Sequence, residues 1–409
     1  MMPDKLTIAG VDVRKARVLM RADFNVPLKG IGEIADDTRI RAALPTMNHL
    51  LQAGGSLVLM SHLGRPKGKP NPEFSLRPVA DHLAELMPSP VKFATDSVGP
   101  SATQLAAGLL PGEILLLENL RFNPGETEND PGFAAGLAQL GQLYVNDAFG
   151  TAHRAHASTV GVTRHFPIRA AGFLMERELQ QMGRLLHDPP RPFVAVLGGA
   201  KVQGKVDVML NLLDQVDTLV LGGGMIFTFF KVLGLEVGDS LVEEESLAVV
   251  KEIMDRSQSS RARLVLPEDC VVSSDFSESG DRKEVLITDI PEKWQGLDIG
   301  SKTTERYTEI LATARAVFWN GPMGVFEMPA FAAGTRAVGE AIGTATTAGA
   351  ISVVGGGDSV AAINQLGLAD RITHISTGGG ASLEYMAGRT LPGVAALTDA
   401  GNLNGSGHN

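Results

Sequence analysis

Short apolar runs that end in clusters of glycine recur through the second half of the chain. The runs and their tips form five junctions: FVAVLGGAK (193–201), TLVLGGGM (218–225), AVFWNGPMG (316–324), ISVVGGGDS (351–359) and ITHISTGGG (372–380). Amphipathic stretches such as LAVVKEIMDR (247–256) lie between the runs. Apolar runs that alternate with helical patterns are typical of a parallel sheet covered on both faces. We therefore predict a doubly wound α/β domain in this half.

The glycine tips indicate what this domain binds. A glycine-rich tip between a strand and a helix lets backbone N–H groups approach a ligand closely, and the helix N-terminus behind it favours negative charge. One tip alone is better explained as a tight turn in which Asp358 or Ser359 caps the helix. Five tips on one edge are different, because ligands bind at the carboxyl ends of parallel strands. The pattern therefore predicts a nucleotide site.

The first half of the chain repeats the pattern with polar tips. Its runs are RVLMRADFNVP (17–27), LVLMSHLGRP (57–66), ILLLENLRFNP (114–124) and LYVNDAFGTAHRAH (143–156). The tips carry Asp23, Asn25, His62, Arg65, Arg121, His153 and Arg154. Taken singly, each Arg is more often a surface charge and each His a core residue. Because the planar fork of Arg matches carboxylate and phosphate groups, the shared edge predicts a pocket for a small acid with several charges.

Composition excludes several classes of function. A chain of 409 residues is long enough for two or three domains, and its net charge of −10 disfavours general nucleic-acid binding. No apolar run reaches the roughly 20 residues that span a bilayer, and MMPDKLTIAG lacks the pattern of a secretory signal, so we expect no membrane partner and a cytoplasmic location. The lone Cys270 is predicted to be a buried apolar residue, which leaves oxygen ligands for any metal.

A helix with an abrupt end separates the two halves. The stretch MERELQQMGRLLHDPPRP (175–192) has apolar residues at helical spacing and then reaches Asp188, Pro189 and Pro190. Proline lacks a backbone N–H and stops a helix. We predict a linker helix over 173–190, between a first domain of residues 1–172 and a second of residues 191–389.

Standard nucleotide motifs fit poorly. The stretch GAKVQGKV (199–206) has the spacing of a P-loop, but Val206 stands where Ser or Thr should hold Mg²⁺. Both GGGMIF and GGGDSV lack the last glycine of the dinucleotide pattern, and neither an H-R-D nor a D-F-G motif occurs. A Rossmann dehydrogenase and a protein kinase are therefore disfavoured.

Nine motifs in a fixed order carry a resemblance to a known family. They are RADFNVP, SHLGRP, LENLRF, DAFGTAHRAH, LGGAKV, LGGGM, FWNGPMGVFE, GGGDS and STGGGASLE. Over roughly residues 5–398 the chain resembles the phosphoglycerate kinases. The resemblance implies two doubly wound, Rossmann-like α/β domains joined by a hinge helix, with the segment 390–409 packed back on the first domain. It also implies an ATP-forming transferase of glycolysis, which moves a phosphoryl group reversibly between 1,3-bisphosphoglycerate and ADP to give 3-phosphoglycerate and ATP.

The resemblance also implies site residues. In the first domain it assigns to 3-phosphoglycerate the residues Asp23, Phe24, Asn25, Arg39, His62, Leu63, Gly64, Arg65, Arg121 and Arg154. In the second domain it assigns to Mg-ADP or Mg-ATP the residues Lys201, Lys205, Gly223, Gly296, Glu327, Gly356, Gly357, Asp358 and Ser359, with Asp358 on the metal. Arg39, in DDTRIR, follows from the resemblance alone. Two positions depart from the family: Ser301 replaces the usual Pro, which questions the stiffness of the adenosine-side loop, and Ser359 replaces the common Thr.

The implied chemistry needs no general base. The acceptor in the ATP-consuming direction is a carboxylate, which is already ionised at pH 7. Catalysis must then come from in-line positioning and from cations on the transferred group, for which the candidates are Arg39, Lys201, Mg²⁺ and the N–H groups near Gly357 and Gly380. Since a phosphoryl group cannot cross open water without hydrolysis, we expect the two domains to close about the hinge. We also expect the protein to be a monomer.

Two alternatives stay open from the residues themselves. The Arg and His tips also suit a kinase that forms an acyl phosphate on another small acid, such as an amino acid. A two-domain protein that only binds an anionic metabolite is a further possibility, although Lys201, Asp358 and Glu327 argue against it. An ATP-coupled assay of candidate acids separates these hypotheses.

Overall fold

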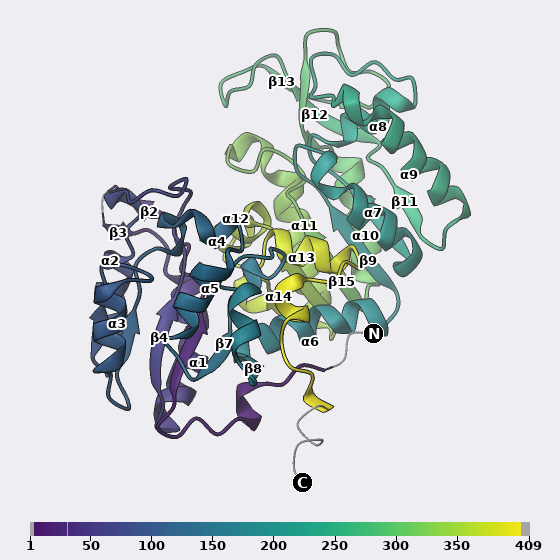
Figure 1. Ribbon diagram of the computed structural model, residues 1–409. Coiled ribbons are helices and arrows are strands. Elements are labelled where there is room, and N and C mark those ends of the chain that lie inside the picture. The colour runs from purple at the N-terminus through teal and green to yellow at the C-terminus, as the bar shows by residue number, and fades with distance from the viewer. Residues whose placement is uncertain (1–3, 31, 402–409) are drawn as a thin grey trace. The chain divides into compact units, whose positions relative to one another are not determined.

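Each apolar run of the sequence forms a strand in the computed structural model, which describes residues 4–30 and 32–401. The chain divides into two units: the first extends to Gln180 and includes the residues from Thr390 onward, and the second is Gln181–Arg389. Figure 1 shows both units, coloured along the chain. No helix in the described part of the chain is long and apolar enough to cross a membrane.

A six-stranded parallel sheet forms the centre of the first unit. Its order is β5-β6-β4-β1-β7-β8. The strands are β1 (Arg17–Arg21), β4 (Ser56–Met60), β5 (Val91–Phe93), β6 (Ile114–Leu116), β7 (Leu143–Asn146) and β8 (Arg169–Ala171). The helices are α1 (Thr38–Gln52), α2 (Arg77–Leu86), α3 (Pro100–Ala107), α4 (Pro124–Thr127), α5 (Pro131–Ala138) and α14 (Pro392–Ala395), and β2 (Leu28–Lys29) pairs with β3 (Glu33–Ile34). Strand β4 is buried at every residue, which explains its unbroken apolar sequence.

The second unit has a parallel sheet of the same size. Its order is β11-β10-β9-β15-β16-β17. The strands are β9 (Phe193–Leu197), β10 (Thr218–Leu221), β11 (Arg263–Val265), β15 (Ala316–Asn320), β16 (Ile351–Gly355) and β17 (His374–Ile375). The helices are α7 (Val206–Gln215), α8 (Ile226–Val232), α9 (Leu247–Ser259), α10 (Ser301–Ala312), α11 (Ala333–Thr347), α12 (Gly357–Gln365) and α13 (Gly380–Met386). The prediction of two α/β domains built on parallel sheets is confirmed.

A small antiparallel sheet in the second unit was not predicted. It consists of β12 (Asp269–Ser273), β13 (Arg282–Leu286) and β14 (Gln295–Ile299), with β12 in the middle. Cys270 lies on β12 and is buried and free, as predicted, and burial raises the pKa of its thiol to about 12. Strand β13 is mostly exposed, so its sequence RKEVL has no apolar run that reveals a strand.

Helix α6 (Phe173–His187) contains the boundary between the units, which falls after Gln180. It ends three residues before the end of the predicted linker helix, because Pro189 and Pro190 cannot continue it.

The C-terminal segment belongs to the first unit. Leu6 donates its backbone N–H to the carbonyl of Thr398 at 2.8 Å, and Thr398 donates its own to the carbonyl of Arg169 at 2.9 Å. Lys5 Nζ lies 2.6 Å from Asp399 Oδ1. The last residues of the predicted segment 390–409, residues 402–409, lie outside the described residues.

Parallel pairing places all the tips of each sheet on one edge, where the carboxyl ends of the strands meet. In the first unit, the edge includes Asp23 after β1 and His62 after β4. In the second unit, it includes the glycines after β9, β10 and β16. Each unit therefore presents one set of candidate site residues on its own edge.

Candidate active site

Three of the predicted substrate residues are joined by hydrogen bonds at the end of β1. Arg39, in the first turn of α1, donates from Nη1 to Asp23 Oδ2 at 3.2 Å and to the carbonyl of Asn25 at 3.1 Å. Asn25 Oδ1 accepts the backbone N–H of Gly64 at 2.8 Å. Asp23 is almost fully buried, whereas a third of the Arg39 side chain is exposed. The arrangement leaves the rest of the guanidinium free to meet an anion.

His62 lies behind this group and is held neutral. Its Nδ1 is 3.1 Å from Arg21 Nη2 and 4.0 Å from Asp23 Oδ1. Burial, followed by the charges of Arg21 and three further arginines, holds the pKa of His62 well below its ordinary value. Because an arginine can only donate, Nδ1 must accept this hydrogen bond, which leaves Nε2 as the N–H donor.

A basic pocket of about 580 Å³ unites the remaining arginines. Arg65, Arg121 and Arg154 line it together with Lys67 and His156. Arg121 is also anchored, because its Nη1 donates to the carbonyl of Gly64 at 2.7 Å. Burial and the neighbouring charge of Arg154 lower the pKa of Arg121 to about 10. A pocket with this much positive charge suits a small acid with several negative groups.

Three predicted residues can offer only their backbone. Phe24 and Leu63 have buried side chains, and the backbone N–H of Phe24 is already bonded to Ser61 Oγ at 2.8 Å. Gly64 has a φ of +61°, and a Cβ there would lie 2.3 Å from the ring of Phe74. Glycine is therefore required at this position, in the tight turn that precedes Arg65.

Sequence reasoning missed the buried polar groups beneath the pocket. Arg21 Nε donates to Ser158 Oγ at 2.9 Å, and that hydroxyl donates to Glu126 Oε1 at 2.6 Å. Glu126 is fully buried, which raises the pKa of its carboxyl, while Arg21 opposes that shift. The only signal in the sequence was the arginine that directly precedes ADFN, at the end of the apolar run VLM.

In the second unit, the segment after β15 connects three of the glycine tips. The backbone N–H of Gly199 bonds to the carbonyl of Pro322 at 2.8 Å, and that of Gly223 bonds to the carbonyl of Met323 at 2.9 Å. Gly321 donates its N–H to Ser359 Oγ at 2.5 Å. Gly223 has a φ of +70°, and a Cβ there would lie 2.3 Å from the nitrogen of Gly199. The glycines thus allow the tips to touch one another.

The GGGDS tip begins α12. Gly356, with a φ of +95°, is the N-cap residue, so the interpretation of Asp358 or Ser359 as the cap is wrong. Gly357 and Asp358 are exposed in the first turn, and Gly380 is exposed at the start of α13. Ser359 is fully buried, and its hydroxyl oxygen accepts the bond from Gly321. The exposed groups, rather than Ser359, are available to a ligand.

Two lysines belong to the same edge. Lys201 is exposed directly after the LGGA tip. Lys205 is partly buried, and burial lowers its pKa while the carboxylates of Asp358 and Glu243 act in the opposite direction. Lys205 and Asp358 are therefore close enough to interact, as expected for groups that share a charged ligand.

The remaining nucleotide candidates lie on β14 and in the segment after β15. Gly296 donates its N–H to Ser240 Oγ at 2.9 Å, and a Cβ at Gly296 would lie 2.0 Å from the ring of Phe227. Glu327 is exposed. Ser301, the departure from the family, is the first residue of α10, and its hydroxyl donates to Glu284 Oε1 at 2.5 Å. This hydrogen bond links the start of α10 to β13.

Within the described residues, no group of three or more His, Cys, Asp or Glu side chains could hold a metal ion. A magnesium site that combines one carboxylate with phosphate oxygens and water needs no such group. Asp358 meets that description, since it is exposed beside the glycine tip and close to Lys205. The residues present fit Mg²⁺ that arrives with a nucleotide.

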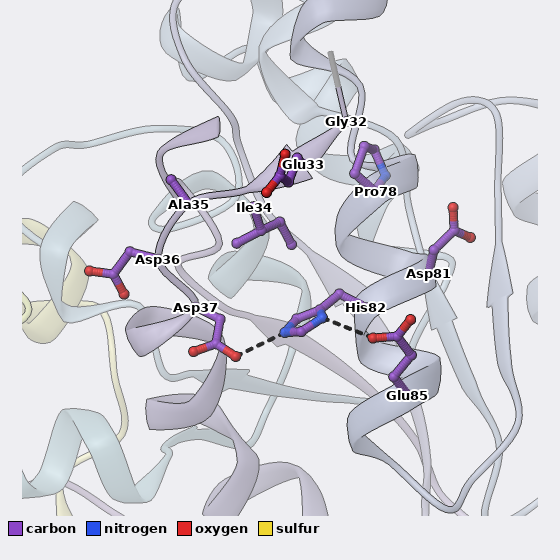
Figure 2. A pocket seen from close by; sticks show the side chains of 10 residues that line it. All are labelled: Gly32, Glu33, Ile34, Ala35, Asp36, Asp37, Pro78, Asp81, His82 and Glu85. Atoms are coloured by element: carbon purple, nitrogen blue, oxygen red, sulfur yellow. Dashed lines mark hydrogen bonds and ion pairs between the residues drawn. The ribbon is translucent and has the colours of Figure 1, made fainter. Parts of the chain in front are cut away.

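A different pocket in the first unit does not fit an anion. It measures about 750 Å³, and its lining includes the carboxylates of Glu33, Asp36, Asp37, Asp81 and Glu85. Figure 2 shows His82 between two of them, with Nε2 at 2.9 Å from Asp37 Oδ2 and Nδ1 at 3.3 Å from Glu85 Oε2. Because its lining is acidic, the basic pocket remains the candidate site for an acid.

Known proteins are similar to this chain over nearly its whole length. A sequence model for a family described as phosphoglycerate kinase matches residues 8–389. Phosphoglycerate kinases of Chloroflexus aurantiacus and Prosthecochloris aestuarii are 57% and 53% identical to it, over 97% of this chain and 100% of their own length. The solved phosphoglycerate kinase of Coxiella burnetii is 39% identical, with a TM-score of 0.85 over 96% of this chain and 99% of that one. The structure from Pyrococcus horikoshii OT3 is 35% identical, with a TM-score of 0.84 over 96% and 98%.

Proposed function

The chain belongs to the phosphoglycerate kinase family, and we propose that its two units divide the two substrates of that reaction between them. It is a transferase of glycolysis, which moves a phosphoryl group reversibly between 1,3-bisphosphoglycerate and ADP to give 3-phosphoglycerate and ATP. The proposal assigns 3-phosphoglycerate to the first unit and the magnesium nucleotide to the second.

One observation carries the first assignment: Arg65, Arg121 and Arg154 line a single pocket at the carboxyl edge of their sheet. A 3-phosphoglycerate molecule has a phosphate and a carboxylate, and guanidinium forks bind both groups well. Arg39 and Asp23, joined at 3.2 Å, lie on the same edge and offer a donor and an acceptor for the hydroxyl and carboxylate. Neutral His62 adds an Nε2 donor.

The second assignment rests on the exposed tip of α12. Gly356, Gly357 and Asp358 present backbone N–H groups and a carboxylate beside Lys205. Asp358 would hold Mg²⁺, which neutralises part of the phosphate charge when it is bound. Gly223, Gly296 and Glu327 would surround the adenosine, and Lys201 would reach the transferred group.

Positioning and charge supply the catalysis in this proposal. The attacking carboxylate is ionised at neutral pH, so no side chain has to remove a proton. Arg39 and Lys201 are the cationic side chains proposed to stabilise the charge on the transferred phosphoryl group, with the N–H groups of Gly357 and Gly380. Water must be excluded at that moment, so we also propose that the units close on their ligands.

An ATP-coupled assay tests the substrate. Rapid ATP consumption with 3-phosphoglycerate, and none with aspartate or glutamate, is expected. Equal turnover of an amino acid would favour the alternative acyl-phosphate kinase, and binding of 3-phosphoglycerate without turnover would favour a protein that only binds the metabolite. We further propose a cytoplasmic monomer, for which size-exclusion chromatography with light scattering should give the mass of one chain, 43.1 kDa.

A further inference from the structure

The segment between β15 and α11, residues 321–332, is central to the second unit. It binds three glycine tips through the backbone bonds of Gly199, Gly223 and Gly321 described above. It also carries Glu327. Any shift of this segment would therefore move several parts of the proposed nucleotide site at once.

Asp298, on β14, fastens the far end of that segment. Its Oδ2 accepts the backbone N–H of Gly334 at 2.9 Å, in the first turn of α11. The N-cap residue of α11 is Ala332, whose side chain cannot cap a helix. Asp298 therefore supplies from another element the cap that α11 lacks.

The near end of the segment rests on the same side chain. A Cβ at Gly324 would lie only 2.3 Å from Asp298 Oδ1, so the backbone of Gly324 packs directly on the carboxylate. The next residue, Val325, donates its N–H to the carbonyl of Leu297 at 2.8 Å. Asp298 thus touches both ends of the segment and stands two residues from Gly296, another residue proposed to surround the adenosine.

Burial of the Asp298 carboxylate costs free energy, which a purely structural role would not require. It is 4% exposed, and burial raises its pKa to about 7, against the backbone N–H groups of Gly334, Ile299 and Ala333, which favour the ionised form. The carboxyl oxygens accept the backbone N–H groups of Ile299 and Gly334 at 2.9 Å each, and a shift of either group would leave a buried N–H without an acceptor.

We propose that Asp298 is a positioning residue for the nucleotide: it sets the spacing between Gly296 and the segment that carries Glu327, and so sets the affinity for ADP and ATP. This proposal rests on the assignment of the nucleotide to the second unit.

Isothermal titration calorimetry of the full chain with MgADP and, separately, with 3-phosphoglycerate tests it. Asp298→Ala should raise the Kd for MgADP about tenfold or more, because it leaves buried N–H groups without an acceptor, and should leave the Kd for 3-phosphoglycerate unchanged. Asp298→Asn retains one acceptor oxygen and should recover part of the affinity. The asparagine variant also allows the proposal to be tested if the alanine variant fails to fold.

Asp217→Asn is the matched control. Asp217 is in the same unit and accepts the N–H of Phe193 at 2.7 Å, at the amino ends of β9 and β10, so the variant should lower Tm without changing either Kd. Asp298 variants that unfold at lower temperature but bind MgADP like wild type, or that lose both ligands equally, would overturn the proposal. Wild-type protein that binds no MgADP would refute the nucleotide assignment itself, and the role of Asp298 with it.

Discussion

Positive charge at the carboxyl edge of the sheet in the first unit is balanced only in part. Arg21, Arg121 and Arg154 all lower the pKa of His62, and the buried carboxylates of Asp23 and Glu126 only partly oppose the lowering of the pKa of Arg121 by burial and Arg154. Like charges that are partly buried repel each other strongly. A bound anion relieves this repulsion, so each exposed arginine of the pocket should contribute to binding of the acid alone.

Arg65→Ala should therefore weaken binding of 3-phosphoglycerate by about 10- to 100-fold, as expected for a charged hydrogen bond, and leave the affinity for ADP nearly unchanged. Titration calorimetry with each ligand measures both. Arg14→Ala is the control, since Arg14 is 79% exposed and pairs with Asp12. Equal losses for the two ligands would refute the assignment of Arg65.

Lys201→Ala should act on turnover instead of binding. A single donor to the transferred group is typically worth about 10²- to 10³-fold in kcat. Steady-state kinetics with saturating substrates measures this, with Lys251→Ala as control because Lys251 is exposed and pairs with Asp255 within α9. A kcat equal to that of wild type would show Lys201 to be an ordinary surface residue.

Acid should destabilise the ligand-free protein through His156. Burial, with Arg21 and Arg121, lowers its pKa from 6.5 to about 4. Between those values the unfolded chain binds more protons than the folded one, so stability present above pH 6.5 is lost as the pH falls toward 4. Between pH 7.5 and 5, the free energy of unfolding should fall by about 1–2 kcal/mol less for His156→Gln than for wild type. Urea unfolding at both pH values measures the difference, and parallel losses would contradict it.

The elements differ in how far the sequence predicts them. Runs such as ISVV and LVLM predict buried parallel strands because both faces of such strands are apolar, and parallel pairing then places their tips together. Strand β13 was not predicted because it is exposed and lacks an apolar run. Arg39 could not be selected from the pattern because it lies on the first turn of a helix and not after a strand. The role of Asp298 could not be predicted, because the fold alone brings its partners, Gly324 and Gly334, close to it.

Helix α12 allows metal binding and helix capping to be separated. Asp358 makes no capping hydrogen bond, so Asp358→Asn should cost only the roughly 0.3–1 kcal/mol of a charge in the first turn. As a ligand, Asn lacks the charge that opposes Mg²⁺, so kcat should fall strongly and the Mg²⁺ midpoint should rise. Kinetics over a Mg²⁺ titration tests this, with Asp370→Asn, at the start of another short helix, as control. Wild-type activity with an unchanged midpoint would place the metal elsewhere.

At the level of the whole molecule, charge is distributed unevenly. The chain has a net charge of −10, yet one pocket is lined by Arg65, Arg121 and Arg154 and another by five carboxylates. Overall charge thus limited the possible partners without locating the site. The candidate site was indicated instead by the edge of each parallel sheet, on which separate strands place their tips.

Closure should require both ligands. Each unit is proposed to hold one substrate, so either ligand alone contacts a single unit. A ligand that contacts one unit cannot stabilise the closed state by contacts with both units. The pair 3-phosphoglycerate and MgADP is suited to the test, because it lacks the phosphoryl group to be transferred and cannot react. Solution X-ray scattering should give a smaller radius of gyration for this ternary complex than for the free protein or either binary complex. If the free protein were already as compact as the ternary complex, or if 3-phosphoglycerate alone produced the full change, exclusion of water would have to arise within one unit, and the proposed division of the substrates would need another means of bringing them together.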